Sequence, residues 1–217
     1  MPLHQPSAPT GPSSQSPKAM ERYQRLRRVV LGGVMLVVGA VLLFGRSLQT
    51  EFIHERLEMI GIMLIVLGIG GRLWSILYIG GRKSAEVVAT GPYSVTRNPL
   101  YVFSAIAAAG VGAQMGSVAA AVGFAVLCAA AFHVVILREE AYLRARLGTP
   151  YEEYCARVPR FLPRLTLYRD QETVTFRPRV LFTTLRDGLV FFLAMPLFEM
   201  VERAQDTGAL PVFFHIW

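Results

Sequence analysis

The longest apolar stretch of the chain, Leu100–Leu137, constrains the fold most, because it exceeds the length of one ordinary membrane helix. Gly110, Gly112 and the polar segment Gln114–Ser117 interrupt it, and such residues mark turns. The chain is 53% hydrophobic and 17% charged, with a mean hydropathy of +0.42, which is more apolar than a soluble domain of 217 residues needs to fill one core. The sequence therefore predicts an integral membrane protein that contains a helical hairpin.

The two helices of this hairpin are expected near Pro99–Ala113 and Ser117–Leu137, the first being short for a full crossing. Pro99 is acceptable in the first turn of a helix, where backbone amides lack intrahelical partners, so the first helix should start just before it. The hairpin then carries Arg97 and Arg138 to the same side of the membrane. Polar motifs at these two ends are predicted to meet there.

Three further apolar segments are candidate membrane helices: Val29–Phe44, Met59–Ile79 and Val180–Met200. Arginines precede the first segment, which favours a cytoplasmic N-terminus. The third segment contains Arg186 and Asp187, so it is either a further span or an interfacial helix, and we favour a spanning or deeply inserted helix. The predicted fold class is thus all-α, a polytopic membrane bundle of about four to five helices.

The remaining segments are polar or short. Residues 1–20 are rich in proline and serine and are expected to form a disordered tail, not a cleaved signal peptide. The mixed loop Arg46–Glu58 should lie on the far side of the membrane, and Ala209–Trp217 is too short to span, so it should pack on the protein or sit in the interface.

Cys128 and Cys155 belong to no Cys/His motif, so neither a disulfide nor a metal site is predicted. The net charge of +7 comes with arginines beside apolar runs, which favours anionic lipid over nucleic acid.

Arg97, Asn98 and Tyr101 stand at the start of the hairpin. If the helix includes Arg97, that residue and Tyr101 share one face at i and i+4, and Asn98 lies one turn from the tyrosine. A guanidinium, an amide and a phenol would then meet at one place. The alternative is an interfacial anchor of arginine and tyrosine with an asparagine helix cap.

His133, Glu139 and Glu140 stand near the end of the hairpin. His133 and Glu140 are seven residues apart, which returns them to nearly the same helix face. Membrane-embedded polar residues are costly and often functional. The alternatives are a hydrogen-bonded packing histidine, an ion pair of Glu140 with Arg144, and a solvated Glu139.

Arg72 lies on the apolar segment that precedes the hairpin. It is either a cation that extends to the interface or a fixed cation at the mouth of a pocket. The same segment carries small residues that let membrane helices approach closely. These are Gly61, Gly68, Gly70 and Gly71.

The order of the motifs carries more information than any one of them. The chain reads GPYSVTRNPLY from Gly91, then the apolar hairpin, then REEAYLRARLGTPYEEY from Arg138 and VPRFLP from Val158. Over about Gly70–Arg164 this order and spacing resembles the isoprenylcysteine carboxyl methyltransferase and phospholipid methyltransferase superfamily of membrane enzymes. The resemblance implies S-adenosylmethionine-dependent methyl transfer, with the cofactor held between the ends of the hairpin and the following tail segment.

The resemblance and the chemistry of the side chains together define the candidate site. The expected catalytic residues are Arg97, Asn98 and Glu140. The expected cofactor-binding residues are Tyr93, Arg97, Asn98, Tyr101, His133, Glu139, Glu140, Tyr151, Tyr154 and Arg160. Arg72 and Phe103 are expected to contact the substrate.

Each role follows from the chemistry of the cofactor. Its carboxylate suits a cation with an amide beside it, its ribose hydroxyls or ammonium suit a glutamate, and its adenine suits a tyrosine face. Methyl transfer depends on in-line positioning and exclusion of water more than on an acid or base. The absence of a nucleophile–base pair in the motifs agrees with this chemistry.

Two positions depart from the pattern of the family. Asn98 stands where the best-known pattern has histidine, and an asparagine cannot carry a proton at neutral pH, so a mechanism that needs a cationic histidine there is excluded. Phe103 stands where the pattern usually has a glycine, and its ring would narrow the pocket or reshape the substrate path. The departure at Phe103 bears on substrate identity more than on use of the cofactor.

The leading prediction is a membrane methyltransferase domain at residues 21–164 with a C-terminal extension at 165–217. Its acceptor should be a membrane lipid or lipid-like molecule, first an isoprenylcysteine-like carboxylate, with a phospholipid amine or a small thiol as alternatives. A non-catalytic membrane scaffold and a nicotinamide-dependent reductase are the alternatives from other classes. The many arginines and few lysines suggest a bacterial source and an inner-membrane location, with the cofactor site facing the cytoplasm.

Overall fold

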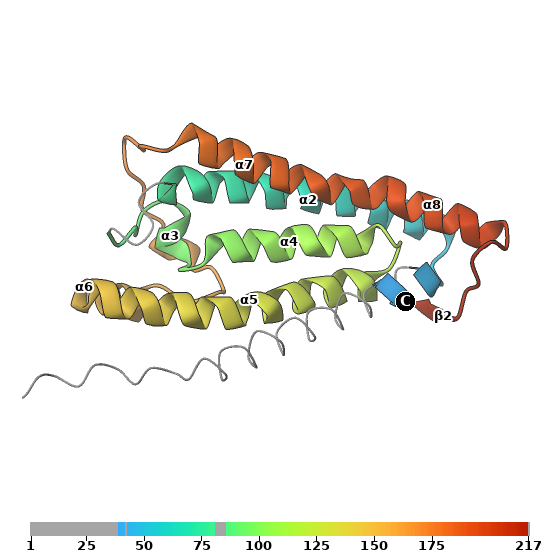
Figure 1. Ribbon diagram of the computed structural model, residues 1–217, viewed down its shortest axis with the longest axis horizontal. Helices are drawn as coiled ribbons and strands as arrows, with labels where there is room; N and C mark the ends of the chain where they lie inside the picture. Colours follow the sequence, from blue (N-terminus) through green and yellow to red (C-terminus); the bar gives the residue numbers. More distant parts are fainter. Residues whose placement is uncertain (1–38, 42, 81–85, 217) are drawn as a thin grey trace, which may run out of the picture. The chain divides into compact units, whose positions relative to one another are not determined.

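The computed structural model describes residues 39–41, 43–80 and 86–216 (Figure 1). The chain divides into two units, Met1–Leu43 and Phe44–Trp217. In the first unit only residues 39–41 and 43 are described, and they are helical. The predicted N-terminal tail and most of the predicted span Val29–Phe44 therefore lie outside the described residues.

The second unit is a helical bundle with one very short sheet. Its elements are β1 (Gly45–Ser47), α2 (Glu51–Ile79), α3 (Pro92–Val95), α4 (Pro99–Ala113), α5 (Val118–Leu147), α6 (Thr149–Arg157), η1 (Leu165–Leu167), α7 (Pro178–Leu189), η2 (Val190–Leu193), α8 (Ala194–Asp206) and β2 (Phe214–Ile216). Within this unit α4 packs against both α2 and α5, and α7 packs along α2 (Figure 1). In the described part of the chain α2, α5 and the run from α7 to α8 are long and apolar enough to cross a membrane. The prediction of an all-α membrane bundle is confirmed.

Helix α2 begins eight residues before the predicted start at Met59. The prediction of a loop over Arg46–Glu58 is wrong from Glu51 onward. Thr50 has an extended backbone conformation and directly precedes the helix. Glu51 places a negative charge in the first turn, where it interacts favourably with the positive end of the helix dipole. The polar residues of this stretch therefore lie on a helix, at one end of the bundle.

Glycines of α2 form its contact with α4. A Cβ atom at Gly68 would lie 2.6 Å from the Cβ of Ala107, so only glycine permits this approach. Gly61 and Gly71 face α4 in the same way, whereas a Cβ at Gly70 would meet no described atom within 4 Å. Three of the four glycines singled out in the sequence thus form the interface, and the fourth lies on the other face.

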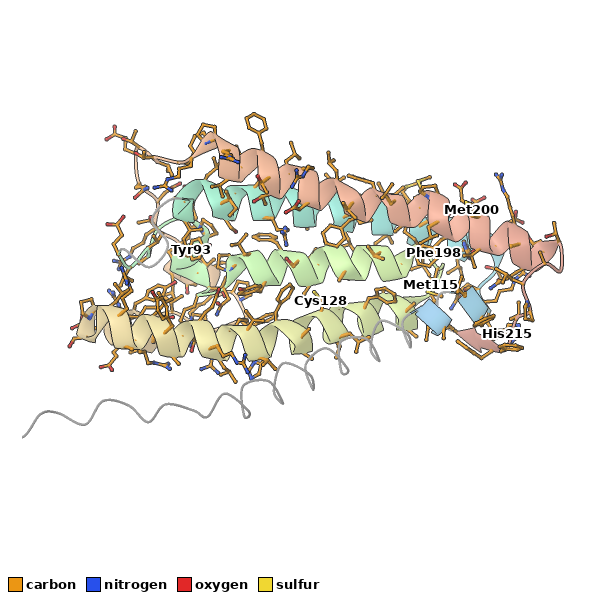
Figure 2. The ribbon with its side chains drawn as sticks, in the orientation of Figure 1. Tyr93, Met115, Cys128, Phe198, Met200 and His215 are labelled. Atoms are coloured by element: carbon orange, nitrogen blue, oxygen red, sulfur yellow. The ribbon has the colours of Figure 1, made fainter. Side chains whose placement is uncertain are left out.

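The turn between α4 and α5 is buried in the protein. Gln114 is 1% exposed, and its Nε2 donates to the backbone oxygen of Glu58 at 2.9 Å. Ser117 Oγ accepts a hydrogen bond from the amide of Ala120 at 3.2 Å and so caps α5. Non-helical backbone that is buried requires such internal partners, because buried polar groups are nearly always hydrogen-bonded. Met115, on the same turn, is also buried (Figure 2).

The two hairpin helices lie as predicted, but α5 continues ten residues beyond Leu137. No helix-breaking residue occurs before Gly148, which adopts a positive φ of 61° and ends the helix. The extra turns carry Glu139 and Glu140 on the same helix as His133.

The C-terminal apolar segment forms a helical run from Pro178 to Asp206, as favoured from the sequence. Pro196 near the start of α8 has no amide to donate to the preceding turn, and the run tightens into the 3₁₀ segment η2 just before it. Met200 on α8 is 68% exposed on the outer surface, while Phe198 points inward (Figure 2). The final segment does not span: β2 pairs in parallel with β1, a small sheet that the sequence did not predict.

Candidate functional site

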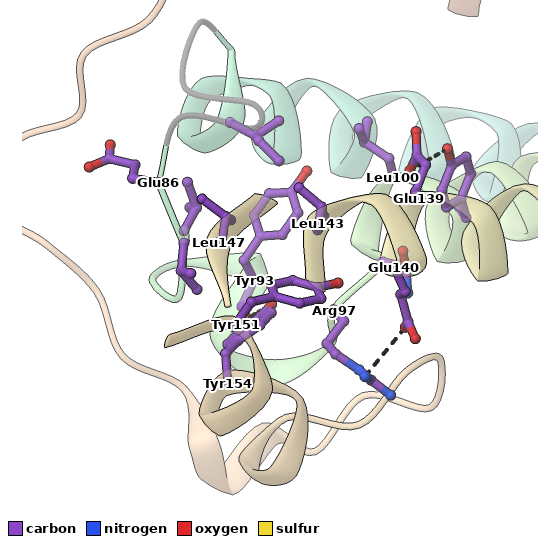
Figure 3. Close-up of a pocket in the computed structure, with 15 residues that line it drawn as sticks. Glu86, Tyr93, Arg97, Leu100, Glu139, Glu140, Leu143, Leu147, Tyr151 and Tyr154 are labelled. Atoms are coloured by element: carbon purple, nitrogen blue, oxygen red, sulfur yellow. Dashed lines mark hydrogen bonds and ion pairs between the residues drawn. The ribbon is translucent and has the colours of Figure 1, made fainter. Parts of the chain in front are cut away.

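A pocket opens where the C-terminal end of α2, helix α3, the start of α4, the end of α5 and helix α6 meet (Figure 3). Its empty space, counted to the open mouth, is about 710 Å³. Its lining residues are Ile79, Glu86, Val87, Val88, Tyr93, Arg97, Asn98, Leu100, Tyr101, Glu139, Glu140, Leu143, Leu147, Tyr151 and Tyr154. Most of the predicted cofactor-binding residues therefore surround one cavity.

Glu140 is the electrostatic centre of this site. Its side chain is only 2% exposed and faces three arginines. Arg160 donates from Nη2 at 2.9 Å and from Nε at 3.1 Å, in the fork geometry that suits a carboxylate. Arg97 Nη1 and Arg144 Nη2 each lie 3.4 Å from its oxygens. A buried carboxylate needs such partners, since an unpaired buried charge is costly.

Backbone hydrogen bonds join the first and last sequence motifs. The amide of Arg97 donates to the oxygen of Pro159 at 2.9 Å, and the amide of Arg164 donates to the oxygen of Val95 at 2.9 Å. Asn98 Nδ2 donates to the oxygen of Arg160, also at 2.9 Å. The segment after α6 thus closes over the link between α3 and α4.

The position of Arg97 differs from the helical geometry considered in the sequence. Helix α4 starts at Pro99, so Arg97 and Tyr101 are not paired across one helix turn. Asn98 occupies the N-cap position, but its side chain makes no capping hydrogen bond and reaches the backbone of Arg160 instead. Both residues are held by the VPRFLP segment, which explains why they still face the pocket.

Aromatic residues form the other walls. Tyr101 donates to Glu139 Oε2 at 3.0 Å, and its ring lies 4.6 Å from that of Phe132. Tyr154 donates to the backbone oxygen of Tyr93 at 2.8 Å. The rings of Tyr151 and Tyr154 are 5.9 Å apart. These contacts fix the aromatic faces that line the cavity.

Burial controls the protonation of these phenols. Removal from water raises the pKa of Tyr93 well above its usual value, and the neighbouring Tyr154 raises it further. Burial likewise raises the pKa of Tyr151 and of Tyr154. The hydrogen bond to Glu140 raises the pKa of Arg160. At neutral pH the pocket therefore presents neutral hydroxyl donors and permanent guanidinium charges.

Two polar atoms at this pocket have no hydrogen-bond partner among the described residues. They are the Tyr93 hydroxyl and Arg97 Nε, and both are buried. Buried polar groups are nearly always partnered, so unpartnered ones mark a place for a ligand. Both atoms are donors under these conditions, so they suit a ligand with acceptor groups.

Four predicted residues are not among those that line the pocket. Arg160 contacts the lining residue Glu140, and the other three lie elsewhere. His133 is exposed on α5 and is not among the residues that line the pocket. Arg72 hydrogen-bonds to Ser104 on α4. Phe103 fills the space over Gly71, with its ring 6.3 Å from that of Trp74, so it packs between α2 and α4 and does not narrow the pocket.

Sequence reasoning missed part of the site. Leu143 and Leu147 line the pocket, and their spacing of four and eight residues from Glu139 was a signal for one helix face. Arg169 lies beyond the recognised motifs, yet its oxygen accepts from the amide of Gly91 at 2.7 Å and its amide donates to Ser94 Oγ at 3.0 Å. No local pattern marks this contact in the sequence.

The fold and the pocket define a class: polytopic membrane proteins with a polar ligand site at the end of a helical hairpin. Residues 57–149 match the family described as phospholipid methyltransferase. The chain belongs to the superfamily of isoprenylcysteine carboxyl and phospholipid methyltransferases, whose phospholipid methyltransferase members depend on S-adenosylmethionine. No solved structure matches the chain significantly.

Two curated relatives are similar over nearly their whole length. The nickel-cobalt-cadmium resistance protein NccN of Alcaligenes xylosoxydans xylosoxydans is 34% identical over 205 residues, which cover 93% of this chain and 95% of the relative. The cobalt-zinc-cadmium resistance protein CzcN of Cupriavidus metallidurans is 33% identical over 207 residues, which cover 94% of each.

Proposed function

We propose that this protein is an integral membrane methyltransferase that uses S-adenosylmethionine. The observation that carries the proposal is the pairing of a buried ion cluster with two unpartnered donors, Arg97 Nε and the Tyr93 hydroxyl, at one pocket. The family of the chain supports the same activity. When bound, the cofactor supplies an electrophilic methyl group on a sulfonium centre.

The side chains at the pocket fit the functional groups of this cofactor. Arg97 is the cation for its carboxylate, and Tyr93 adds a neutral hydroxyl donor. Glu139, half-buried and hydrogen-bonded by Tyr101, suits ribose hydroxyls or an ammonium group. Tyr151 offers an aromatic face for adenine or for the cationic centre. The fit supports cofactor binding, and it requires no metal and no general base.

Glu140, Asn98 and Arg160 act as positioning residues in this proposal. Glu140 is already surrounded by three guanidinium groups, so its main effect is to hold Arg97 in place. Asn98 and Arg160 join the same cluster through the hydrogen bond at 2.9 Å. Such support matters because methyl transfer depends on orientation, and small displacements of binding groups cost rate.

The acceptor in this proposal is an amphiphile that enters from the lipid. Arg72 is a half-buried cation on α2, two turns from the pocket residue Ile79, and its Nε has no partner among the described residues. A cation inside an apolar bundle favours an anionic acceptor group. This favours a carboxylate of the isoprenylcysteine type over a phospholipid amine or a small thiol.

We place the pocket on the cytoplasmic side of a bacterial inner membrane. The pocket end of the bundle carries many arginines, as positive-inside topology requires. These include Arg97, Arg138, Arg144, Arg146, Arg157, Arg160, Arg164 and Arg169. A soluble cofactor would then enter from the cytoplasm while the acceptor enters from the bilayer.

A role in resistance to heavy metals is the second candidate, because the names of two relatives assign it to them. The two candidates are compatible if methylation of a membrane component alters metal tolerance. They are alternatives if the chain serves resistance as a non-catalytic scaffold. Cofactor binding separates these cases.

The test is calorimetric titration of the detergent-purified protein with S-adenosylhomocysteine. Saturable binding is expected. Arg97→Ala and Glu139→Gln should each weaken this binding by about tenfold or more, because each variant loses one charge-assisted hydrogen bond to the ligand. Glu153→Gln is the matched control, because Glu153 is exposed on α6 and lies outside the pocket. Folded protein that shows no binding would leave the scaffold as the function.

A further inference from the structure

A second hollow lies at the other end of α2. The helix has 29 residues, so its ends are about 43 Å apart at 1.5 Å per residue. The hollow has about 990 Å³ of empty space to its open mouth. Its lining residues are Arg46, Ser47, Gln49, Glu51, His54, Glu55, Glu58, Glu199, Glu202 and Asp206. Six of these ten are carboxylates, in a chain whose net charge is +7.

Three side chains in this hollow converge on one point. His54 Nε2 lies 3.3 Å from an oxygen of Glu58 and 3.2 Å from an oxygen of Glu202. All three ligand atoms lie within 4.8 Å of one another. One imidazole N–H can donate a good hydrogen bond to only one of the two carboxylates. The arrangement is therefore more than a simple hydrogen-bonded pair.

The spacing agrees with that of ligands around a metal ion. With metal–ligand distances of about 2.1 Å, neighbouring atoms of a tetrahedral site lie about 3.4 Å apart. The two distances from His54 are close to this value. Glu58 and Glu202 come from different helices, α2 and α8, and rotation of their side chains can close the remaining separation. Three protein ligands also leave a fourth position for water.

The backbone holds the histidine in place independently of the acidic residues. Gly116 has a positive φ of 60°, and a Cβ there would overlap the ring of His54, so the glycine provides the space that the ring occupies. Ser47 Oγ donates to the oxygen of Gly116 at 2.7 Å. Gln114 ties the same turn to the backbone of Glu58 at 2.9 Å. Two of the three ligands are thus braced by the buried turn between α4 and α5.

We propose that His54, Glu58 and Glu202 form a binding site for a divalent transition-metal ion, on the membrane face opposite the pocket. One imidazole with two carboxylates suits Zn²⁺, Co²⁺ or Ni²⁺, whereas Mg²⁺ and Ca²⁺ prefer oxygen ligands alone. The other carboxylates of the hollow attract cations to it. The site is independent of methyl transfer, because none of its residues lines the cofactor pocket.

The competing explanation is a protonated His54 shared by two carboxylates without a metal. Calorimetric titration of the metal-free, full-length protein in detergent with Zn²⁺ distinguishes the two. The proposal expects saturable binding of one ion that excess Mg²⁺ does not displace. Co²⁺ should give a visible absorption band of the intensity typical of a low-coordinate site with a nitrogen ligand.

Matched variants locate the ion. His54 and Glu202 lie on different helices, and His54→Gln and Glu202→Gln should each weaken Zn²⁺ binding by at least about tenfold. Loss of a residue that only supports a metal ligand already costs about tenfold in affinity, and these two residues are proposed as ligands themselves. Glu51→Gln lies in the same hollow outside the cluster and should change affinity by less than about twofold. Circular dichroism and thermal unfolding check that each variant folds. Absence of saturable Zn²⁺ binding, equal competition by Mg²⁺, or equal losses in the Glu51 variant would overturn the proposal.

Discussion

The carboxylate of Glu140 and the guanidinium of Arg160 form a two-point ion pair across 20 residues of sequence, at 2.9 and 3.1 Å. This pair links the end of α5 to the segment after α6. Arg97 joins it at 3.4 Å from the opposite wall. The cluster therefore holds the three sequence motifs of the site in one place.

Glu140→Gln keeps the shape of the side chain but removes its charge. Three arginines would then face one another without a counter-charge, and breaking a buried ion pair in this way costs about 3 kcal/mol. Thermal unfolding in detergent should show a large decrease in the midpoint. Glu153→Gln, which is exposed on α6, should leave the midpoint unchanged. Equal midpoints for the two variants would contradict a central role for the cluster.

Tyr154→Phe removes one hydroxyl from the wall of the pocket. The backbone oxygen of Tyr93 loses its donor at 2.8 Å, at a cost of about 1 kcal/mol. The expected result is a modest decrease in the free energy of unfolding, together with weaker binding of S-adenosylhomocysteine through movement of Tyr93. Tyr142→Phe is the control, since Tyr142 is exposed on α5 and outside the pocket.

Gly68→Ala tests the close contact of α2 with α4. The added Cβ would lie 2.8 Å from backbone atoms of Phe103 and Ala107, which cannot yield without moving the helix, so a loss of about 1–3 kcal/mol is expected. Gly70→Ala is the matched variant two residues away, and it meets no described atom within 4 Å. It should be neutral or stabilising by about 0.5–1 kcal/mol, because alanine favours helix. Similar unfolding midpoints for both variants would show that the helices do not pack as described.

The buried phenols predict how stability depends on pH. Tyr93, Tyr151 and Tyr154 have pKa values raised by burial, whereas in the unfolded chain they ionise near pH 10. Below that pH both states are protonated and the full stability is present. As the pH rises further, the unfolded state ionises first, so stability falls through this range.

Unfolding midpoints measured from about pH 8 to 11 should therefore decrease at the upper end. Tyrosinate absorbance of the folded protein should show a fraction of phenols that resists ionisation. Tyr154→Phe should shrink this fraction. Full ionisation of all tyrosines near pH 10 in folded protein would contradict their burial.

Local patterns in the sequence were sufficient for the hairpin. The glycines and polar residues at 110–117 predicted the turn, and Pro99 predicted the start of α4, because both effects act within a few residues. The extended length of α5 was missed, since the fall in hydropathy after Leu137 is not itself a helix stop. The end of an apolar pattern indicates where a helix leaves the membrane, and the helix itself can continue beyond that point.

Contacts between distant segments were less predictable. The order of motifs predicted that Arg97 and Glu140 meet, but not that Arg160 supplies the stronger contact. His54 and Glu202 are far apart in the chain and belong to no motif, so no sequence pattern predicts their approach at 3.2 Å. Such pairs depend on how α8 packs, and a single sequence does not encode that packing in a local pattern.

The separation of charge along α2 has a consequence for how the molecule sits in an energised membrane. Carboxylates gather at one end and guanidinium groups at the other. Each charge moved across a potential of 100 mV changes the free energy by about 2.3 kcal/mol. In a membrane that is negative inside, the field itself favours the orientation with the arginines inward, which is the orientation that we propose.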